Sequence, residues 1–332
     1  MKNDLIPMIN NYKKDGLEFV EVTNNVGLTV TFCNLGGSIY SIKYNGELMT
    51  YQAKEIKDFL REDVYNGKAL GRVAGRIPDG QLVVDKKVYK LCPNEGKTVL
   101  HGGKGAISSK KFSLRVFNTT DHVHVVYTYF SLAGEAGFPG NGLFEVHYTI
   151  MNDVPSCKVK LLSYVNEKTP VSMTLHTFFS VGEENLKNLS LKINASNYLD
   201  ISKETLVVGD AKKVPECLDF RKSKPILKDI DDPFINGGKL KGYDHSFIFD
   251  KVDEKKPQVV LESKKYKVNV FTDFDSVIVY SDNFDAKFEA DNSKEKTRRG
   301  VAIEPQLSQN KEHYLCRSEE FCHYIRYEFA KK

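Results

Sequence analysis

The feature that most constrains the fold of this chain is the alternation of apolar and polar side chains along many short segments. Residues 144–150 read FEVHYTI and residues 321–329 read FCHYIRYEF, so every second side chain is apolar or carries a ring. Further segments of strand character lie at 28–32, 122–130, 158–165, 266–271 and 276–281. A period of two places alternate side chains on opposite faces of a strand. Because clusters of Gly, Asn, Asp and Pro separate these segments, we predict an all-β sandwich or barrel of mostly antiparallel strands.

The signal for helix is weak, and we expect only a turn or two near 54–61 and 184–189. Residues 85–87 (DKK) separate two short apolar segments and predict a hairpin tip. Residues 221–242 are polar and contain Pro and Gly, which predicts a long functional loop. Residues 291–299 (DNSKEKTRR) predict a solvent-exposed hairpin tip.

No linker divides the chain, because the same strand character continues on both sides of residues 221–242. A length of 332 residues suggests two domains by simple division, yet all-β domains often exceed about 200 residues. We therefore predict a single domain over residues 1–332, with its core at about 18–330.

Composition and charge exclude several classes of protein. The net charge of +4 is too small and too evenly spread for a nucleic-acid-binding protein. No apolar run approaches the roughly 18 residues of a membrane-spanning helix, and the N-terminus has no apolar run of a secretory signal. The six cysteines form no CxxC pair and are expected to be reduced thiols. We therefore predict a cytoplasmic protein that binds neither nucleic acid nor membrane.

Five ionisable side chains lie in segments that combine turn residues with hydrogen-bonding groups, and each has an ordinary structural explanation. These are Arg76 (surface ion pair), His101 (turn), His176 (core histidine), Asp244 (turn cap) and Glu304. Glu304 is the hardest to explain structurally, because it follows the apolar run 301–303 and an unpaired buried carboxylate is costly. Its position before Pro305 places it at the end of a strand, facing a partner or a pocket.

The pattern of these residues favours proton transfer over metal or cofactor chemistry. The segment 96–98 (GKT) lacks the glycine spacing of a phosphate-binding loop, since position 91 is Leu. His122 and His124 share one strand face but have no evident third metal ligand. We predict no cofactor and no metal. Two histidines, two carboxylates and an arginine, without a nucleophile motif, suit acid–base chemistry on a neutral polyhydroxylated ligand.

Seven short motifs, in order from about residue 18 to 330, resemble those of the aldose 1-epimerase (galactose mutarotase) family. They are GRVAGRI at 71–77, LHGG at 100–103, FPGN at 138–141, LHTFF at 175–179, GYDH at 242–245, YSDNF at 280–284 and AIEPQ at 302–306. Each motif is weak alone, but all seven occur in the family's order and at similar spacing.

The resemblance implies a β-supersandwich that binds a small sugar in a cleft and interconverts its anomers without a cofactor. It implies that Glu304 is the general base and His176 the general acid, with Glu304 ionised and His176 protonated at the start. His101, Arg76 and Asp244 would hold the hydroxyls, and Gln306 would be a further binding or supporting residue. The protein would act as a monomer or a homodimer.

Departures from the family motifs leave the natural substrate open. The motif asparagines are replaced by Gly75 and Ser180, a motif glutamine by Ile278, and the segment after AIEPQ by LSQNK at 307–311. The sugar is thus galactose, glucose or a larger sugar such as maltose. The alternatives are an epimerase for sugar phosphates, for which Lys104 is the candidate cation, a non-catalytic carbohydrate-binding protein and a glycoside hydrolase.

The chain contains no tryptophan, so any aromatic wall against a sugar must come from Phe or Tyr. Phe178, Phe179 and Tyr243 are the nearest candidates in sequence.

Overall fold

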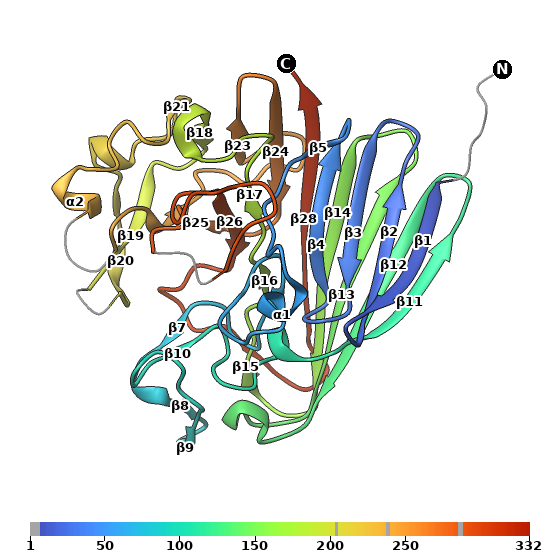
Figure 1. The fold of residues 1–332 in the computed structure, drawn as a ribbon. Helices are drawn as coiled ribbons and strands as arrows, with labels where there is room; N and C mark the ends of the chain where they lie inside the picture. The colour runs from blue at the N-terminus through green and yellow to red at the C-terminus, as the bar shows by residue number, and fades with distance from the viewer. Residues whose placement is uncertain (1–6, 203–204, 237–239, 285–287) are drawn as a thin grey trace.

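Antiparallel strands dominate the structure, a computed structural model that describes residues 7–202, 205–236, 240–284 and 288–332 (Figure 1). The largest sheet has nine strands in the order β11-β12-β13-β14-β28-β24-β23-β18-β21. Their bounds are β11 Ser113–Asn118, β12 His122–Ser131, β13 Gly142–Met151, β14 Ser156–Val165, β28 Glu320–Lys331, β24 Tyr266–Thr272, β23 Val259–Glu262, β18 Ser190–Ile193 and β21 Lys224–Pro225. The predicted all-β class and the strands at 122–130, 144–150, 158–165, 266–271 and 321–329 are confirmed.

Two further sheets contain most of the remaining strands. The first, in the order β1 to β5, is formed by Met8–Lys14, Leu17–Thr23, Leu28–Cys33, Ser38–Tyr44 and Glu47–Leu48. The second has the order β17-β26-β25-β22-β19-β20, formed by Phe178–Phe179, Val301–Gln306, Ser276–Tyr280, Asp244–Ile248, Asn197–Ile201 and Val207–Lys213. The strands predicted at 28–32 and 276–281 are β3 and β25.

Four two-stranded pairs complete the described strands. They are β10 (Val99–Leu100) with β7 (Arg76–Ile77), β16 (Thr174–Leu175) with β6 (Ala69–Leu70), β15 (Thr169–Pro170) with β27 (Tyr314–Leu315), and β8 (Gln81–Val84) with β9 (Lys87–Lys90). The β8–β9 hairpin confirms the tip predicted at 85–87, where Asp85 and Lys86 have positive φ.

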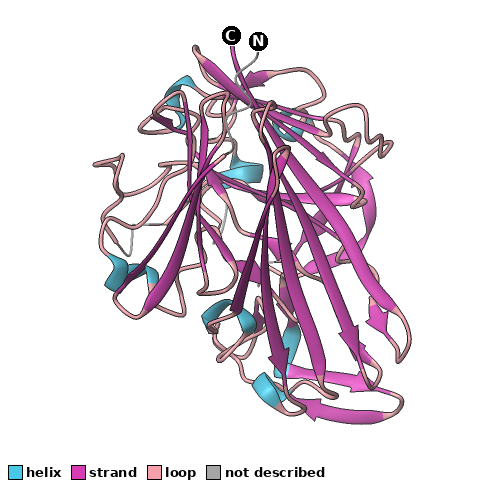
Figure 2. Ribbon diagram, turned by 90° about the vertical axis from the view of Figure 1, so that its right-hand side faces the viewer, coloured by secondary structure: helices cyan, strands magenta, loops and turns pink. Residues whose placement is uncertain are grey.

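Helices are short and lie in loops between the strands (Figure 2). The turn expected near 54–61 is helix α1 (Ile56–Phe59), and an unpredicted helix α2 spans Pro233–Asn236. The segment 184–189 contains only one 3₁₀ turn, Leu186–Asn188, whose first turn is capped because the Asn185 side chain accepts a hydrogen bond from the amide of Lys187. Among the described residues, no helix is long and apolar enough to cross a membrane.

The two smaller sheets cover the same face of the nine-stranded sheet side by side (Figure 1). Phe32 of β3 packs on Tyr148 of β13 with ring centroids 4.5 Å apart, and Phe179 of β17 packs on Tyr327 of β28 at 5.1 Å. Strand β13 buries every second residue completely, which is the physical result of its alternating sequence. One hydrophobic cluster extends from Val20 to Phe329. It supports the single-domain prediction, which remains a prediction.

Two loop predictions need correction. The described part of segment 221–242 contains β21 and α2 and buries Ile226, Ile230 and Ile235 in the main core, so it is anchored by apolar packing. The segment 291–299 does connect the paired strands β25 and β26. Its last residue, Arg299, is buried in an ion pair with Asp282, and therefore this segment is not a simple exposed tip.

None of the six cysteines, all of which lie within the described residues, is paired in a disulfide. Their reduced state remains a prediction.

Candidate active site

A cleft of about 380 Å³ lies at one face of the six-stranded sheet and collects side chains from most of the chain length. Five of the six predicted site residues line it: Arg76, His101, His176, Asp244 and Glu304. Gln306 does not line the cleft; it is fully buried at the end of β26, and neither of its amide atoms has a partner among the described residues. The structure thus brings together residues that are up to 228 positions apart in sequence (304 − 76).

The register of three adjacent strands places two carboxylates on one face of the sheet. Asp244 of β22 pairs with Tyr280 of β25, and Glu304 of β26 pairs with Ile278 of β25. Because positions 278 and 280 are two residues apart, their partners in both neighbouring strands face the same side. This side forms the floor of the cleft, from which Asp244, Tyr280, Ile278 and Glu304 all reach the cavity.

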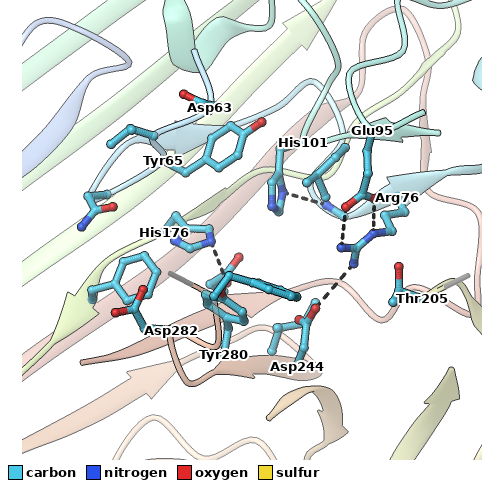
Figure 3. A pocket seen from close by; sticks show the side chains of 18 of the residues that line it. Asp63, Tyr65, Arg76, Glu95, His101, His176, Thr205, Asp244, Tyr280 and Asp282 are labelled. Carbon is cyan, nitrogen blue, oxygen red and sulfur yellow. Dashed lines mark hydrogen bonds and ion pairs between the residues drawn. The ribbon is translucent and has the colours of Figure 1, made fainter. Parts of the chain in front are cut away.

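Arg76 is held between two carboxylates at one side of the cleft (Figure 3). Its Nε lies 2.6 Å from Glu95 Oε2 and its Nη2 3.1 Å from Glu95 Oε1, while its Nη1 lies 3.7 Å from Asp244 Oδ2. The two-point contact with Glu95 fixes the plane of the guanidinium. Sequence reasoning missed Glu95, because it lies in a polar turn with no motif.

His101 is oriented by a loop that only glycine can form. Its amide donates to the carbonyl of Gly75, and its Nδ1 accepts from the amide of Gly75. A Cβ on the next residue, Gly102, would lie 2.1 Å from the carbonyl oxygen of Gly71, so no other residue fits there. Since Nδ1 is an acceptor, neutral His101 carries its proton on Nε2, as a donor.

His176 and Glu304 form the central pair of the cleft. His176 Nε2 lies 3.3 Å from Glu304 Oε1, and both side chains are buried. Burial lowers the pKa of His176 to about 4. Burial, and next the charge of Asp244, raise the pKa of Glu304 well above its ordinary value, against a smaller effect of Arg76. Burial therefore favours the neutral form of each group, contrary to the expected ionised Glu304 and protonated His176.

The pKa of His101 is also shifted far from its ordinary value. Burial, followed by the nearby His176 and Arg76, lowers it well below that value, so His101 is neutral at neutral pH. The pKa of Asp244, in contrast to that of His101, is raised. Burial is the main cause, and it outweighs the lowering effect of Arg76.

The same groups could also hold a metal ion. His101, His176 and Glu304 each offer one ligand atom, and these atoms lie within 4.8 Å of one another. Two imidazoles and a carboxylate are ligands that transition metals accept. The absence of a metal therefore stays a prediction.

Aromatic rings surround the two histidines, though not all of them are the ones expected. Phe178 lines the cleft and packs on His176 with centroids 4.8 Å apart. Tyr65, which sequence reasoning missed, contacts His101 at 4.9 Å and His176 at 6.0 Å. Phe179 and Tyr243 are instead fully buried in the main core. Each is adjacent in sequence to a residue that lines the cleft, Phe178 and Asp244 respectively.

The fold and the cleft define a β-sandwich protein whose acid–base groups meet in one cleft. Residues 18–328 match the sequence profile of the family described as aldose 1-epimerase. The chain belongs to the aldose 1-epimerase family, and is therefore an isomerase of the mutarotase class.

Individual relatives agree with this assignment. The chain is 30% identical to the aldose 1-epimerase of Haemophilus influenzae over 281 residues, 80% of this chain and 79% of that enzyme. It is 28% identical to the galactose mutarotase of Sus scrofa over 236 residues, 69% of this chain and 66% of that protein. The crystal structure of galactose 1-epimerase from Lactobacillus acidophilus has the same fold, with a TM-score of 0.87, 24% identity and 98% of both chains covered.

Proposed function

We propose that this protein interconverts the α and β anomers of a free aldose such as galactose or glucose by opening and closing the sugar ring. The observation that carries the proposal is the His176–Glu304 pair, 3.3 Å apart in the cleft. Galactose is favoured among aldoses because several similar proteins are named galactose mutarotase.

The reaction needs two proton transfers and one broken bond. Glu304, as general base, takes the proton of the anomeric hydroxyl while the bond between C1 and the ring oxygen breaks. His176, as general acid, gives a proton to the ring oxygen. In the open-chain aldehyde the bond between C1 and C2 rotates, and the reverse transfers close the ring to the other anomer. No atom or electron is gained or lost overall.

The pair must hold one proton in total for this cycle to run. A proton that rests on Glu304 can pass to His176 across the 3.3 Å contact when sugar hydroxyls donate to the carboxylate and lower its pKa. Burial thus does not oppose the proposed roles, because the raised pKa of Glu304 helps the pair to retain its single proton.

The remaining polar groups would hold the sugar in one orientation. Arg76 and neutral His101 offer donors, Asp244 offers acceptors, and all three line the cleft. Directed hydrogen bonds of this kind suit neutral hydroxyls. Gln306 lies two residues after Glu304 on β26, buried beyond the edge of the cleft, and would act by supporting Glu304.

The arrangement of charges argues against a sugar phosphate as substrate. The two arginines that line the cleft, Arg76 and Arg299, are each paired with a carboxylate, and Lys104 does not line it. A maltose-like sugar would have to fit the same cleft with its second ring near the apolar residues Ile201, Val207 and Ile278.

The decisive experiment follows optical rotation after pure α anomers are dissolved, over a panel of galactose, glucose, maltose and galactose 6-phosphate. We expect galactose or glucose to be accelerated most, with no loss of activity after EDTA treatment. Sugar binding without acceleration would indicate a carbohydrate-binding protein. Preference for the phosphate, or release of a sugar from an aryl glycoside, would replace the proposal with the corresponding alternative.

Changing Glu95 to glutamine tests the support of Arg76. We expect KM for the aldose to rise about three- to ten-fold with kcat nearly unchanged, because one charge-assisted contact that fixes the guanidinium is lost. The control is Asp85→Asn, which removes an exposed partner of Lys168 outside the cleft. Equal KM values in Glu95→Gln and wild type would show that Arg76 is held without Glu95 or does not contact the sugar.

A further inference from the structure

Gly75 and Gln309 occupy the same part of the cleft wall, although they come from opposite ends of the chain. Both line the cleft. A Cβ built on Gly75 would lie 1.6 Å from Gln309 Nε2 and 2.7 Å from Gln309 Cδ. The amide of Gln309 therefore fills the volume that any side chain at position 75 would need.

The backbone around Gln309 is anchored, so its side chain starts from a fixed point. The preceding residue, Ser308, donates from its amide to Asp275 Oδ1 and from its hydroxyl to Asp275 Oδ2, both at 2.8 Å. The carbonyl of Ser308 also contacts His313 Nε2 at 2.9 Å. This double contact fixes the loop directly after β26, the strand that carries Glu304.

The amide nitrogen of Gln309 is buried, and within the described residues it has no hydrogen-bond partner. A buried donor without a partner costs stability, so native structures rarely keep one without a reason. The nitrogen packs against Gly75, while the Gln309 side chain as a whole lines the cleft. A rotation of the terminal amide would bring this nitrogen into the cleft, where a sugar hydroxyl would accept its hydrogen bond. An uncharged amide can also hydrogen-bond a neutral hydroxyl without placing an unpaired charge in the cleft.

We infer that Gln309 is a sugar-binding residue of this enzyme, and that it supplies the amide which the resembled motif carries as asparagine at position 75. The inference rests on the proposed function of the same cleft. The exchange keeps an amide in the same part of the cleft wall but supplies it from a different segment of the chain, on a side chain that is one methylene longer. Gly75 and Gln309 are consequently a coupled pair, because any side chain at position 75 requires the Gln309 amide to move.

The test is a double-mutant cycle of Gly75→Asn and Gln309→Ala, measured on α-galactose by optical rotation. We expect Gln309→Ala to raise KM about ten-fold with kcat changed less than three-fold, as for the loss of one hydrogen bond to substrate. Gly75→Asn should lose more, because its side chain collides with Gln309. The double variant should recover at least five-fold in kcat/KM over Gly75→Asn, since the space is then free.

Two matched controls distinguish this coupling from a non-specific disturbance of the fold by the substitutions. Gly46→Asn places the same residue at φ +83, close to the +85 of Gly75, where a Cβ meets no atom within 4 Å. Asn310→Ala shortens the exposed neighbour of Gln309. Both controls should keep wild-type KM, and thermal unfolding of every variant checks that the fold is retained.

Sugars lacking single hydroxyls identify the contact. KM of wild type and Gln309→Ala is measured for 2-deoxygalactose, 6-deoxygalactose and a 4-deoxy analogue. The difference in KM should vanish for one of these sugars, the one that lacks the hydroxyl bound by Gln309. An equal effect on all sugars, or independent single effects in the cycle, would overturn the inference. Saturation-transfer NMR with galactose on the same variants reports binding without turnover. An inactive wild type whose galactose binding still weakens in Gln309→Ala would therefore refute the proposed reaction while supporting the contact.

Discussion

Replacing Glu304 with glutamine is expected to lower kcat for anomer interconversion by at least about 100-fold, because a positioned base typically contributes 10²–10⁴-fold. The amide has nearly the shape of the carboxyl but cannot accept the anomeric proton. KM should change less than about three-fold, since the groups assigned to hydroxyl binding, Arg76, His101 and Asp244, are untouched. Initial rates of optical rotation over a range of galactose concentrations measure both constants.

The matched control is Glu312→Gln, which makes the same chemical change at an exposed glutamate outside the cleft. It should be indistinguishable from wild type. Thermal unfolding adds a second readout: burial raises the pKa of Glu304, so a neutral amide at this position should leave the melting temperature unchanged or higher. A Glu304→Gln variant that is stable, binds galactose and turns over normally would refute the assignment of the base.

The all-β fold class was predictable from the sequence, because a period of two in side-chain polarity is typical of β-strands and not of helices. Strand β13 alternates along its whole length, and its buried and half-exposed residues alternate in the same way. The order of strands in the sheets was not predictable from this pattern, because β14 pairs with β28, more than 150 residues later. Such pairing depends on which buried faces match, and periodicity carries no such information.

The cleft residues that lie in recognisable sequence motifs were predicted, and those outside the motifs were missed. Glu304 drew attention as a carboxylate after an apolar strand, and it is buried in the cleft. Glu95 and Tyr65 lie in irregular segments, and only tertiary structure brings them to Arg76 and the histidines. Phe179 was misplaced because adjacent residues of a strand face opposite sides, so only Phe178 of that pair reaches the cleft.

Burial also changes the protonation states that the catalytic roles of Glu304 and His176 would suggest. The catalytic roles alone suggest that Glu304 is ionised and His176 is protonated. Both side chains are buried, however, and burial favours the neutral form of each. The proton count of the pair, rather than the charge of either member, is what the cycle requires. This distinction is measurable, because two ionisable groups 3.3 Å apart are expected to give apparent pKa values that belong to the pair.

Changing His176 to asparagine should remove the general acid and alter the shape of the pH profile. In the wild type, kcat/KM should fall as pH decreases towards about 4, where His176 takes up a second proton. It should fall again above the raised pKa of Glu304, where the pair loses its only proton.

In His176→Asn, kcat should drop by at least about 100-fold. The residual activity should then rise with pH through the pKa of Glu304, because only the ionised carboxylate can act as base. A single rising limb in place of a bell is the signature that distinguishes a lost acid from a damaged cleft. His122→Asn, on the strand β12 outside the cleft, should keep both the rate and the bell. A His176→Asn profile that keeps the wild-type shape would show that another group donates the proton to the ring oxygen, whatever the loss in rate.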